Sequence, residues 1–354
     1  MDAFEFTPLQ GRVVFGRGTL SRIADEVQRL GCERAFVLSD AHHAKGAAAS
    51  LVQSLGAMVA GFSTDAVMHT PVEVTDRVLQ DVDSTRPDCL VSLGGGSTTG
   101  LSKALALRTG LPQIVIPSTY AGSEATPILG QTELGRKTTL RSPKVLPRTI
   151  VYDVDLTLGM PAHLSVVSGM NAMAHAVEAL YAKDGNPVTA MLAEQGIAAL
   201  ARALPRIVAN LGDADARSDA LFGAWACGNC LGTVGMALHH KLCHTLGGSF
   251  DLPHAETHTV ILPHAAAFNA VAAPEALDRV ARAIGAETAG AGLFDMIESL
   301  GAPRSLKAIG MSESDLDKAT EIAIAAPYWN PRPIDRSAIR ALLDDAFHGR
   351  RPSQ

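Results

Sequence analysis

The first half of the chain alternates short apolar runs with longer amphipathic stretches. The apolar runs are rich in β-branched residues and are predicted as strands, at residues 12–16, 35–40, 58–63, 89–96, 113–119 and 149–153. Helical spacing appears between them, for example at 19–31 and 72–85. Strands that are apolar throughout and alternate with helices are typical of a parallel sheet with helices on both faces. We therefore expect an α/β domain in this half.

The pattern changes near residue 160. Ala-rich segments with helical periodicity continue from there to the end of the chain, and strand signals are nearly absent. A chain of 354 residues is long enough for two cores. We therefore divide it into an α/β domain, 1–157, and an all-helical domain, 158–354, with the boundary falling near 155–162.

Composition limits the class of partner. Hydrophobic residues make up 47% of the chain and charged residues 19%, as in a compact folded protein. The net charge of -6 argues against a nucleic acid or an acidic membrane, because both bind basic faces. No apolar run reaches the roughly 18 residues of a membrane span, and residues 1–10 lack the features of a signal peptide. We expect a cytoplasmic protein.

The five cysteines are scattered along the sequence. Cys227 and Cys230 form a single CxxC motif, without the second CxxC or the paired histidines of a zinc finger. We interpret this motif as packing within an apolar helix, and we expect a reduced protein without structural disulfides.

The segment LVSLGGGSTTGLSKAL, residues 90–105, places three glycines between a predicted strand and a predicted helix. Glycines at this point let the backbone approach a diphosphate, and the first amides of the helix can then donate to its oxygens. The segment lacks the GxGxxG fingerprint, and a tight turn alone would explain one glycine. It indicates a nucleotide site only together with other signals.

Two other segments strengthen the nucleotide prediction. Asp40 ends a predicted strand, where a carboxylate can bind a ribose and disfavour a 2′-phosphate, although an aspartate that caps a helix is also common there. Residues 117–126, PSTYAGSEAT, form a loop dense in hydroxyls after another strand. We expect NADH as the cofactor, with NADPH also accepted. The expected cofactor-binding residues are Asp40, Gly94, Gly95, Gly96, Ser97, Thr98, Ser118, Thr119, Ser123, Thr126 and Lys137.

Histidines gather in the helical half. Eight of the 12 lie between His163 and His264. A lone histidine is more often structural than functional, but helical spacing places His240 and His244 on one face, and imidazole can ligate a metal or move protons near neutral pH. His239 is expected to matter less, because a helix turns it about 100° away from His240.

The segment SGMNAMAHAVEAL, residues 168–180, has the spacing of a metal site with one unusual ligand. Asn171 and His175 stand four residues apart in a helix-favouring segment, so both side chains leave the same face. A carboxylate at the first position would complete half of a divalent-metal site. Asparagine is a neutral and poorer ligand, so the segment leaves open whether a metal is kept.

The chain resembles the iron-containing, group III alcohol dehydrogenases over nearly its whole length. The resemblance is carried by FGRGTL, GGGSTTGLSKALA, IPSTYAGSEAT, SPKVLPRTIVYDVDLTLGMP, GMNAMAHAVEAL and HHKLCHTLGGSFDLPHAETHTVILPH. It implies a Rossmann-like N-terminal domain, an all-helical C-terminal domain, and an active site in the cleft between them. The family's metal is usually held by an aspartate and three histidines. The matching positions are Asn171, His175, His240 and His254, and His244 matches a further pocket histidine.

Departures from the family pattern point to one subgroup. Asn171 replaces the aspartate, and PSTYAGSE is one residue shorter than the usual loop. Both features, with PYWNPRPIDRSAIRALLDDAFHGRRP near the C-terminus, resemble the maleylacetate reductases. The resemblance implies NAD(P)H-dependent reduction of the carbon–carbon double bond of maleylacetate to 3-oxoadipate, in the degradation of aromatic compounds. It also implies that no metal is needed, and a homodimer.

The expected chemistry agrees with asparagine at position 171. Hydride addition to an enone develops charge on an enolate oxygen, which hydrogen-bond donors can stabilise without a metal. Asn171 can donate where an aspartate cannot, and a histidine can supply the proton that completes the reduction. Candidates to bind the carboxylates of this small dicarboxylate are Tyr120 and Arg332, with Lys241 less favoured because it points away from the face of His240.

Three alternatives remain open. The nearest is a metal-dependent (Fe or Zn) alcohol or polyol dehydrogenase of the same family, with Asn171 as a neutral ligand. A nucleotide-binding module without activity is disfavoured by the full set of histidines. A zinc-dependent lyase on the related dehydroquinate synthase scaffold is disfavoured by the missing carboxylate.

Overall fold

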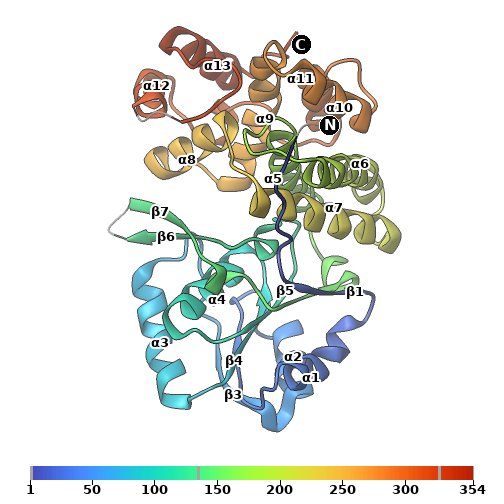
Figure 1. Ribbon diagram of the computed structural model, residues 1–354, viewed down its shortest axis with the longest axis vertical. Coiled ribbons are helices and arrows are strands. Elements are labelled where there is room, and N and C mark those ends of the chain that lie inside the picture. The colour runs from blue at the N-terminus through green and yellow to red at the C-terminus, as the bar shows by residue number, and fades with distance from the viewer. Residues whose placement is uncertain (1–2, 134–135, 326–327, 354) are drawn as a thin grey trace. The chain divides into compact units, whose positions relative to one another are not determined.

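Six parallel strands form the sheet of the N-terminal unit in the computed structural model (Figure 1), in the order β1-β8-β5-β4-β2-β3. The structure describes residues 3–133, 136–325 and 328–353, and of residues 136 and 137 only the backbone. The strands are β1 (Arg12–Gly16), β2 (Ala35–Leu38), β3 (Val59–Ser63), β4 (Cys89–Gly94), β5 (Gln113–Pro117) and β8 (Thr149–Asp153). All six lie within a residue or two of the predicted runs, which confirms the parallel α/β prediction.

Helices cover both faces of this sheet (Figure 1). On one face, α1 (Ile23–Arg29) and α2 (Ala47–Leu55) bury Ile23 and Leu51 against alternate residues of the strands. On the other face, α3 (Val72–Thr85) and α4 (Gly96–Thr109) bury side chains such as Val78 and Leu105 against Phe36 and Leu38 of β2. The central strands β2, β4 and β5 are buried along their whole length, which explains why their sequences are apolar throughout.

An antiparallel hairpin of β6 (Ile128–Glu133) and β7 (Arg136–Arg141) was absent from the predicted strands. Its sequence is largely polar and lacks the apolar run that marks a buried strand. Short 3₁₀ turns complete the unit, at η1 (Thr19–Arg22), η2 (Gly56–Met58), η3 (Ser123–Ala125), η4 (Pro143–Val145) and η5 (Val154–Thr157).

The second unit is helical throughout its described residues, as predicted. Its helices are α5 (Ala162–Leu180), α6 (Pro187–Ala209), α7 (Ala214–Thr233), α8 (Leu238–Phe250), α9 (His254–Ala270), α10 (Pro274–Ile284), α11 (Ala289–Ser299), α12 (Leu316–Ile324) and α13 (Arg336–His348), with 3₁₀ turns η6 (Lys307–Ile309) and η7 (Glu313–Asp315). Among the described residues, the two compact units are 8–160 and 3–7 with 161–353. The sequence division at 157 had placed residues 3–7 with the sheet.

Helix α5 is the centre of the helical unit. Every residue from Ser165 to Ala179 is buried, and α5 packs against α6, α7 and α9. Small residues permit this approach, because a Cβ at Gly169 would lie 2.9 Å from the Leu204 side chain on α6. At the contact of α6 with α7, a Cβ at Gly196 would lie 2.7 Å from the Cys227 sulfur. Cys227 and Cys230 are free and buried in α7, which confirms the packing interpretation of the CxxC motif.

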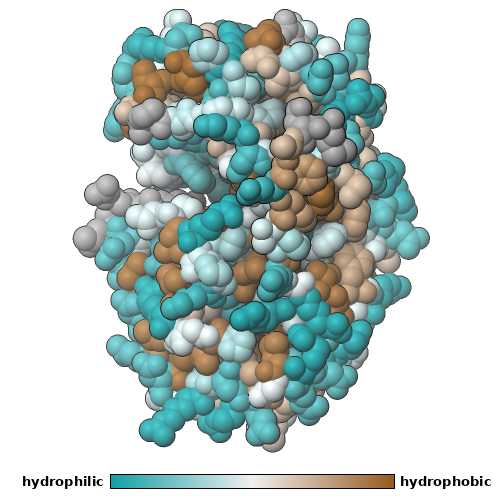
Figure 2. Space-filling view, viewed as in Figure 1, coloured by the Kyte–Doolittle hydropathy of each residue, from teal (hydrophilic) through white to brown (hydrophobic). Residues whose placement is uncertain are grey.

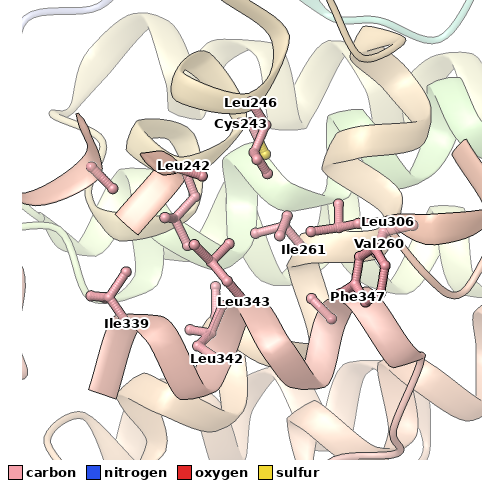
Figure 3. Close-up of a cluster of buried hydrophobic side chains, with 14 of the residues drawn as sticks. Leu242, Cys243, Leu246, Val260, Ile261, Leu306, Ile339, Leu342, Leu343 and Phe347 are labelled. Atoms are coloured by element: carbon pink, nitrogen blue, oxygen red, sulfur yellow. The ribbon is translucent and has the colours of Figure 1, made fainter. Parts of the chain in front are cut away.

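A second apolar cluster joins α8, α9, α12 and α13. Leu343 and Phe347 of α13 belong to it together with Leu242 of α8 and Ile261 of α9 (Figure 3). On the outer surface, hydrophilic side chains cover most of the face seen in Figure 2, with apolar residues between them in small groups. Across the described ranges, no single helix is long and apolar enough to cross a membrane. Helices α7 and α8 meet that test only as a pair bent by 96°.

Lys103 anchors the loop that follows β5. It lies on α4, and its buried Nζ donates to the main-chain oxygens of Ser123, Thr126 and Ile128 at 2.6–2.8 Å, and to Thr126 Oγ1. Burial lowers the pKa of Lys103 to about 7, while the charge of Glu124 acts in the opposite direction. The four oxygen acceptors favour the ammonium form of Lys103. Helix α4 therefore holds the loop mainly through hydrogen bonds from Lys103 to main-chain oxygens.

Replacing Lys103 by methionine should remove this anchor. Three main-chain carbonyls then lose a donor, and we expect the free energy of unfolding to fall by about 3 kcal/mol. Urea unfolding of both proteins measures this change, with the exposed Lys144→Met as the matched control. Equal stability of Lys103→Met and the parent would contradict the anchoring role.

Candidate active site

The nucleotide signals converge at one edge of the sheet. Strands β5, β4 and β2 are neighbours, and their carboxyl ends lie at the same edge. Helix α2, which follows β2, and helix α4, which follows β4, pack on opposite faces. This is a topological switch point, the place where open parallel sheets bind ligands. Asp40 follows β2 at this point, and the three glycines follow β4.

The glycine turn brings main chain close to this edge. A Cβ at Gly94 would lie 2.3 Å from Thr98 Oγ1 and 2.9 Å from Asp40 Oδ2, so no larger residue fits. A Cβ at Gly95 would lie 3.2 Å from the Thr119 methyl group. Gly96 starts α4 with open space beside it, and no acidic residue occupies the first turn of this helix. No side chain caps this turn, so its first amides can receive a phosphate.

Asp40 already has partners within the protein. His43 donates to it from its main-chain nitrogen at 3.0 Å and approaches it with ring Nδ1 at 2.9 Å, and Thr98 donates at 3.3 Å. Burial raises the pKa of Asp40, but the hydrogen bonds from His43 and Thr98 outweigh burial and lower it overall. The carboxylate is therefore ionised near neutral pH, which is the form that would repel a 2′-phosphate.

The hydroxyl groups of the loop after β5 differ in whether they have a hydrogen-bond partner. The Oγ atoms of Ser118 and Ser123 are buried and have no hydrogen-bond partner within the described chain. Thr126 Oγ1 is engaged, since it accepts from Lys103 and donates to the Ser123 carbonyl. Tyr120 is fully buried. Lys137 belongs to β7, but its side chain lies outside the described residues.

In the helical unit, α5 and α8 bring together most of the predicted catalytic residues. The rings of His175 and His240 have centroids 5.2 Å apart, and His244 lies one turn further along α8, with its ring 6.2 Å from that of His240. His254, the first residue of α9, has its ring 4.5 Å from that of His258. His244 is exposed, whereas His175 and His240 are buried.

Three buried polar atoms of the predicted catalytic residues lack a hydrogen-bond partner within the described residues. They are Asn171 Oδ1, His175 Nδ1 and His240 Nε2. An unpaired buried polar atom costs about 1–3 kcal/mol, so such a group is retained where a ligand can satisfy it. Burial, and then the charges of the neighbouring histidines, lower the pKa of His175 well below its ordinary value. This ring is therefore neutral and able to ligate or to hydrogen-bond.

The sequence interpretation missed Glu178. Its buried carboxylate accepts from His240 Nδ1 at 2.6 Å, and from the main-chain amides of Ala237 and His239 at 3.0 and 2.8 Å. The signal was present, because Glu178 follows Asn171 by seven residues and His175 by three, which places all three on one face of α5.

A second histidine pair lies beside the first. His239 Nε2 is 2.9 Å from His258 Nδ1, and both rings are buried. His239 is therefore an internal residue that contacts the His258 side chain of α9. Cys243 completes a group of donors within 4.8 Å of one another. Two nitrogens on one tetrahedral zinc lie about 3.3 Å apart at ordinary bond lengths. We therefore interpret the His239–His258 contact as a hydrogen bond in which one ring donates and the other accepts.

The segment after α12 carries the remaining candidates. The side-chain amides of Asn330 and Asn269 pair reciprocally at 2.7 and 3.1 Å, which anchors this segment to α9. Arg332 stacks on the Phe268 ring at 4.1 Å and donates to the Phe268 carbonyl. Lys241 Nζ lies 5.7 Å from the ring centroid of Tyr328, whose buried hydroxyl is unpaired among the described atoms. Tyr328 is a second polar group that the sequence interpretation missed.

The four candidate ligands are enough in number for a divalent metal, but none of them carries the negative charge that would offset the charge of the ion. Asn171, His175, His240 and His254 occupy the family's ligand positions, and three of them present an unpaired buried atom. All four are neutral ligands, whereas an aspartate would offset part of the charge of the ion.

A parallel sheet with a glycine turn at its switch point and a helical unit with a polar histidine cluster are the features expected of an NAD(P)H-dependent oxidoreductase. The chain belongs to the iron-containing alcohol dehydrogenase family: residues 10–154 match the family described as iron-containing alcohol dehydrogenase, and residues 165–347 match its C-terminal part.

Individual relatives are similar over their full length. The chain is 56% identical to the maleylacetate reductase of Rhizobium sp. (strain MTP-10005), covering 99% of this chain and 100% of that protein. The crystal structure of maleylacetate reductase from Agrobacterium tumefaciens matches with a TM-score of 0.96 at 55% identity, covering 99% of this chain and 100% of that one. An iron-containing alcohol dehydrogenase from Corynebacterium glutamicum matches with a TM-score of 0.95 at 41% identity, covering 100% and 99%.

Asp40 is expected to set the choice of cofactor. In Asp40→Ala, the ratio of kcat/KM for NADPH to that for NADH should rise, because repulsion of the 2′-phosphate and a bond to the ribose are lost together. Asp40→Asn separates these effects, since it removes only the charge. Steady-state kinetics with both cofactors measures the ratio, and Asp25→Ala on the exposed face of α1 is the control. An unchanged ratio would place Asp40 outside the adenosine site.

One histidine of α8 is expected to deliver the proton. Alanine at that position should lower kcat by roughly a hundredfold or more. His240→Ala and His244→Ala are compared with His348→Ala at the end of α13, because truncating the buried His239 would disturb the fold. Near-parental kcat in both α8 variants would exclude proton delivery from this helix.

Proposed function

We propose that this protein reduces the carbon–carbon double bond of maleylacetate with NADH, giving 3-oxoadipate. The observation that carries the proposal is Asn171 at the first ligand position of an otherwise complete family histidine set. The names of the full-length relatives support the same substrate, a small dicarboxylate. The five cysteines are free and buried, which suits a reduced, cytoplasmic compartment. The proposed form is a homodimer without a nucleic-acid or membrane partner, in keeping with the net charge of -6.

In the proposed mechanism, the glycine turn and the start of α4 bind the pyrophosphate, and Asp40 binds the adenosine ribose. Ser97, Thr98, Ser118, Thr119, Ser123 and Lys137 complete the polar contacts with the cofactor. Thr126 is proposed to act indirectly, because its hydroxyl holds the loop to Lys103.

Hydride from nicotinamide C4 adds to the alkene carbon β to the ketone, and the electron pair of the double bond moves to the ketone oxygen as an enolate. Asn171 and the neutral ring of His175 donate hydrogen bonds to that oxygen. A histidine of the group His240, His244 and His254 then gives a proton to the carbon next to the ketone, which completes the single bond. The proton is replaced from solvent.

Charge favours asparagine over aspartate in this pocket. Glu178 already places one buried carboxylate on the same face of α5, and its partners are amides and an imidazole rather than a cation. A second carboxylate at position 171 would add another negative charge beside a dianionic substrate. Arg332 and Tyr120 are proposed to bind the substrate carboxylates, with Arg332 acting through the guanidinium nitrogens that do not bind the Phe268 carbonyl.

We propose that the reaction needs no metal. If a divalent ion is bound, Asn171, His175, His240 and His254 would hold it, and it would supply Lewis-acid stabilisation of a developing oxyanion. The three unpaired donor atoms favour this second candidate, a metal-dependent alcohol or polyol dehydrogenase. Oxidation of NADH on adding maleylacetate, with and without a chelator and with the product identified by mass, distinguishes the two. Loss of activity with chelator, restored by Fe²⁺ or Zn²⁺, would support the alternative.

Replacing Asn171 by aspartate should convert the pocket toward metal binding. A carboxylate supplies the charge that asparagine lacks, so affinity for zinc should rise clearly above that of the parent. Maleylacetate reduction should fall at the same time, because the new charge repels a dianion and removes a donor to the enolate. Isothermal titration with zinc and an NADH assay follow the two effects. Tight metal binding by the parent itself would contradict this interpretation of Asn171.

A further inference from the structure

Glu178 lies on α5, but its carboxylate caps the N-terminus of α8. Helix α8 has no side-chain cap of its own and no acidic residue in its first turn. Glu178 Oε2 accepts from the main-chain nitrogens of Ala237 and His240, and Oε1 accepts from that of His239. The amides and the positive end of the helix dipole stabilise negative charge at this buried carboxylate.

The same carboxylate determines which nitrogen of His240 is free. His240 Nδ1 lies 2.6 Å from Glu178 Oε2, and a carboxylate can only accept, so Nδ1 carries a proton. In a neutral ring the other nitrogen is then bare, and Nε2 is the buried atom without a partner. Because the main-chain amide of His240 also points to Oε2, at 3.4 Å, the carboxylate restrains both the backbone and the ring of this residue.

We infer that Glu178 is a positioning residue of the active site. It holds His240 as the Nδ1–H tautomer, so Nε2 is the nitrogen that can take up a proton from solvent and pass it to the substrate. It also links the helix of Asn171 and His175 to that of His240. The role of Nε2 in turnover rests on the proposed function, whereas the tautomer does not. If Glu178 were only a structural cap, it would stabilise α8 but would not determine the tautomer of His240.

Nitrogen NMR of the full-length protein labelled with ¹⁵N-histidine tests the tautomer without any substrate. At pH about 8.5, two units above the ordinary histidine pKa, Nδ1 of His240 should be protonated and Nε2 bare. The His240 signals are assigned by their loss in His240→Asn. A protonated Nε2 in the parent protein would overturn the inference, whatever the enzyme reduces.

Glu178→Gln tests the positioning role in catalysis. The amide keeps the volume but can accept at only one of the two positions. With NH₂ at the Oε2 position it faces Nδ1, and the His240 tautomer shifts toward Nε2–H; with NH₂ at the Oε1 position it opposes the main-chain amide of His239 and loosens the start of α8. We expect kcat with maleylacetate to fall by roughly ten- to a hundredfold, with KM for NADH unchanged within about twofold. Parental tautomer and kcat in a folded Glu178→Gln protein would overturn the inference.

Two comparisons complete the design. Tyr181→Phe removes the other side-chain donor to Glu178, a contact at 3.5 Å, and leaves the His240 bond, so tautomer and kcat should stay at parental values. If circular dichroism shows that Glu178→Gln does not fold, the His240 tautomer measured in the parent protein decides whether the inference holds. Failure of the parent to oxidise NADH with maleylacetate would refute the proposed function and leave the tautomer result standing.

Discussion

The helical unit depends on the way in which it satisfies one buried carboxylate. An apolar bundle accepts an ionised group only when fixed donors replace water, because the unpaired charge would cost several kcal/mol. Glu178 obtains these donors from the first main-chain amides of α8. The start of α8 is thereby fixed against α5, and the two histidines at that start occupy defined positions. The geometry of the polar cluster is therefore determined by backbone hydrogen bonds as much as by side-chain packing.

Most of the fold could be predicted from the hydrophobic pattern. Apolar strands buried on both faces have an unambiguous sequence pattern, and α3 begins and ends where its periodicity does. The β6–β7 hairpin could not be predicted in this way, because strands such as 136–141 carry a polar sequence and are defined by pairing with each other rather than by a core. The short helix α2 was not among the predicted helices either, since nine residues are too few to establish a helical period.

The candidate site was predicted less completely than the fold. Spacing alone brought Asn171 and His175 together, but contacts between residues far apart in the sequence escaped it. Glu178 meets His240 across 62 positions of sequence, and Asn330 meets Asn269 across 61. The residue spacing within one helix cannot predict contacts between residues so far apart in the sequence. Thr126 is a related case: its hydroxyl suited a cofactor contact, but no pattern along the chain indicated that Lys103 would bind it from another element.

The anchoring of the loop after β5 has an evolutionary consequence. Three of the four acceptors of Lys103 are main-chain oxygens, and a main-chain oxygen is the same in every amino acid. Apart from Thr126, the residues of this loop can therefore change without loss of the attachment to α4. A protein built in this way can acquire new side chains at the edge of its sheet, and hence new specificities, while the path of the loop is inherited unchanged.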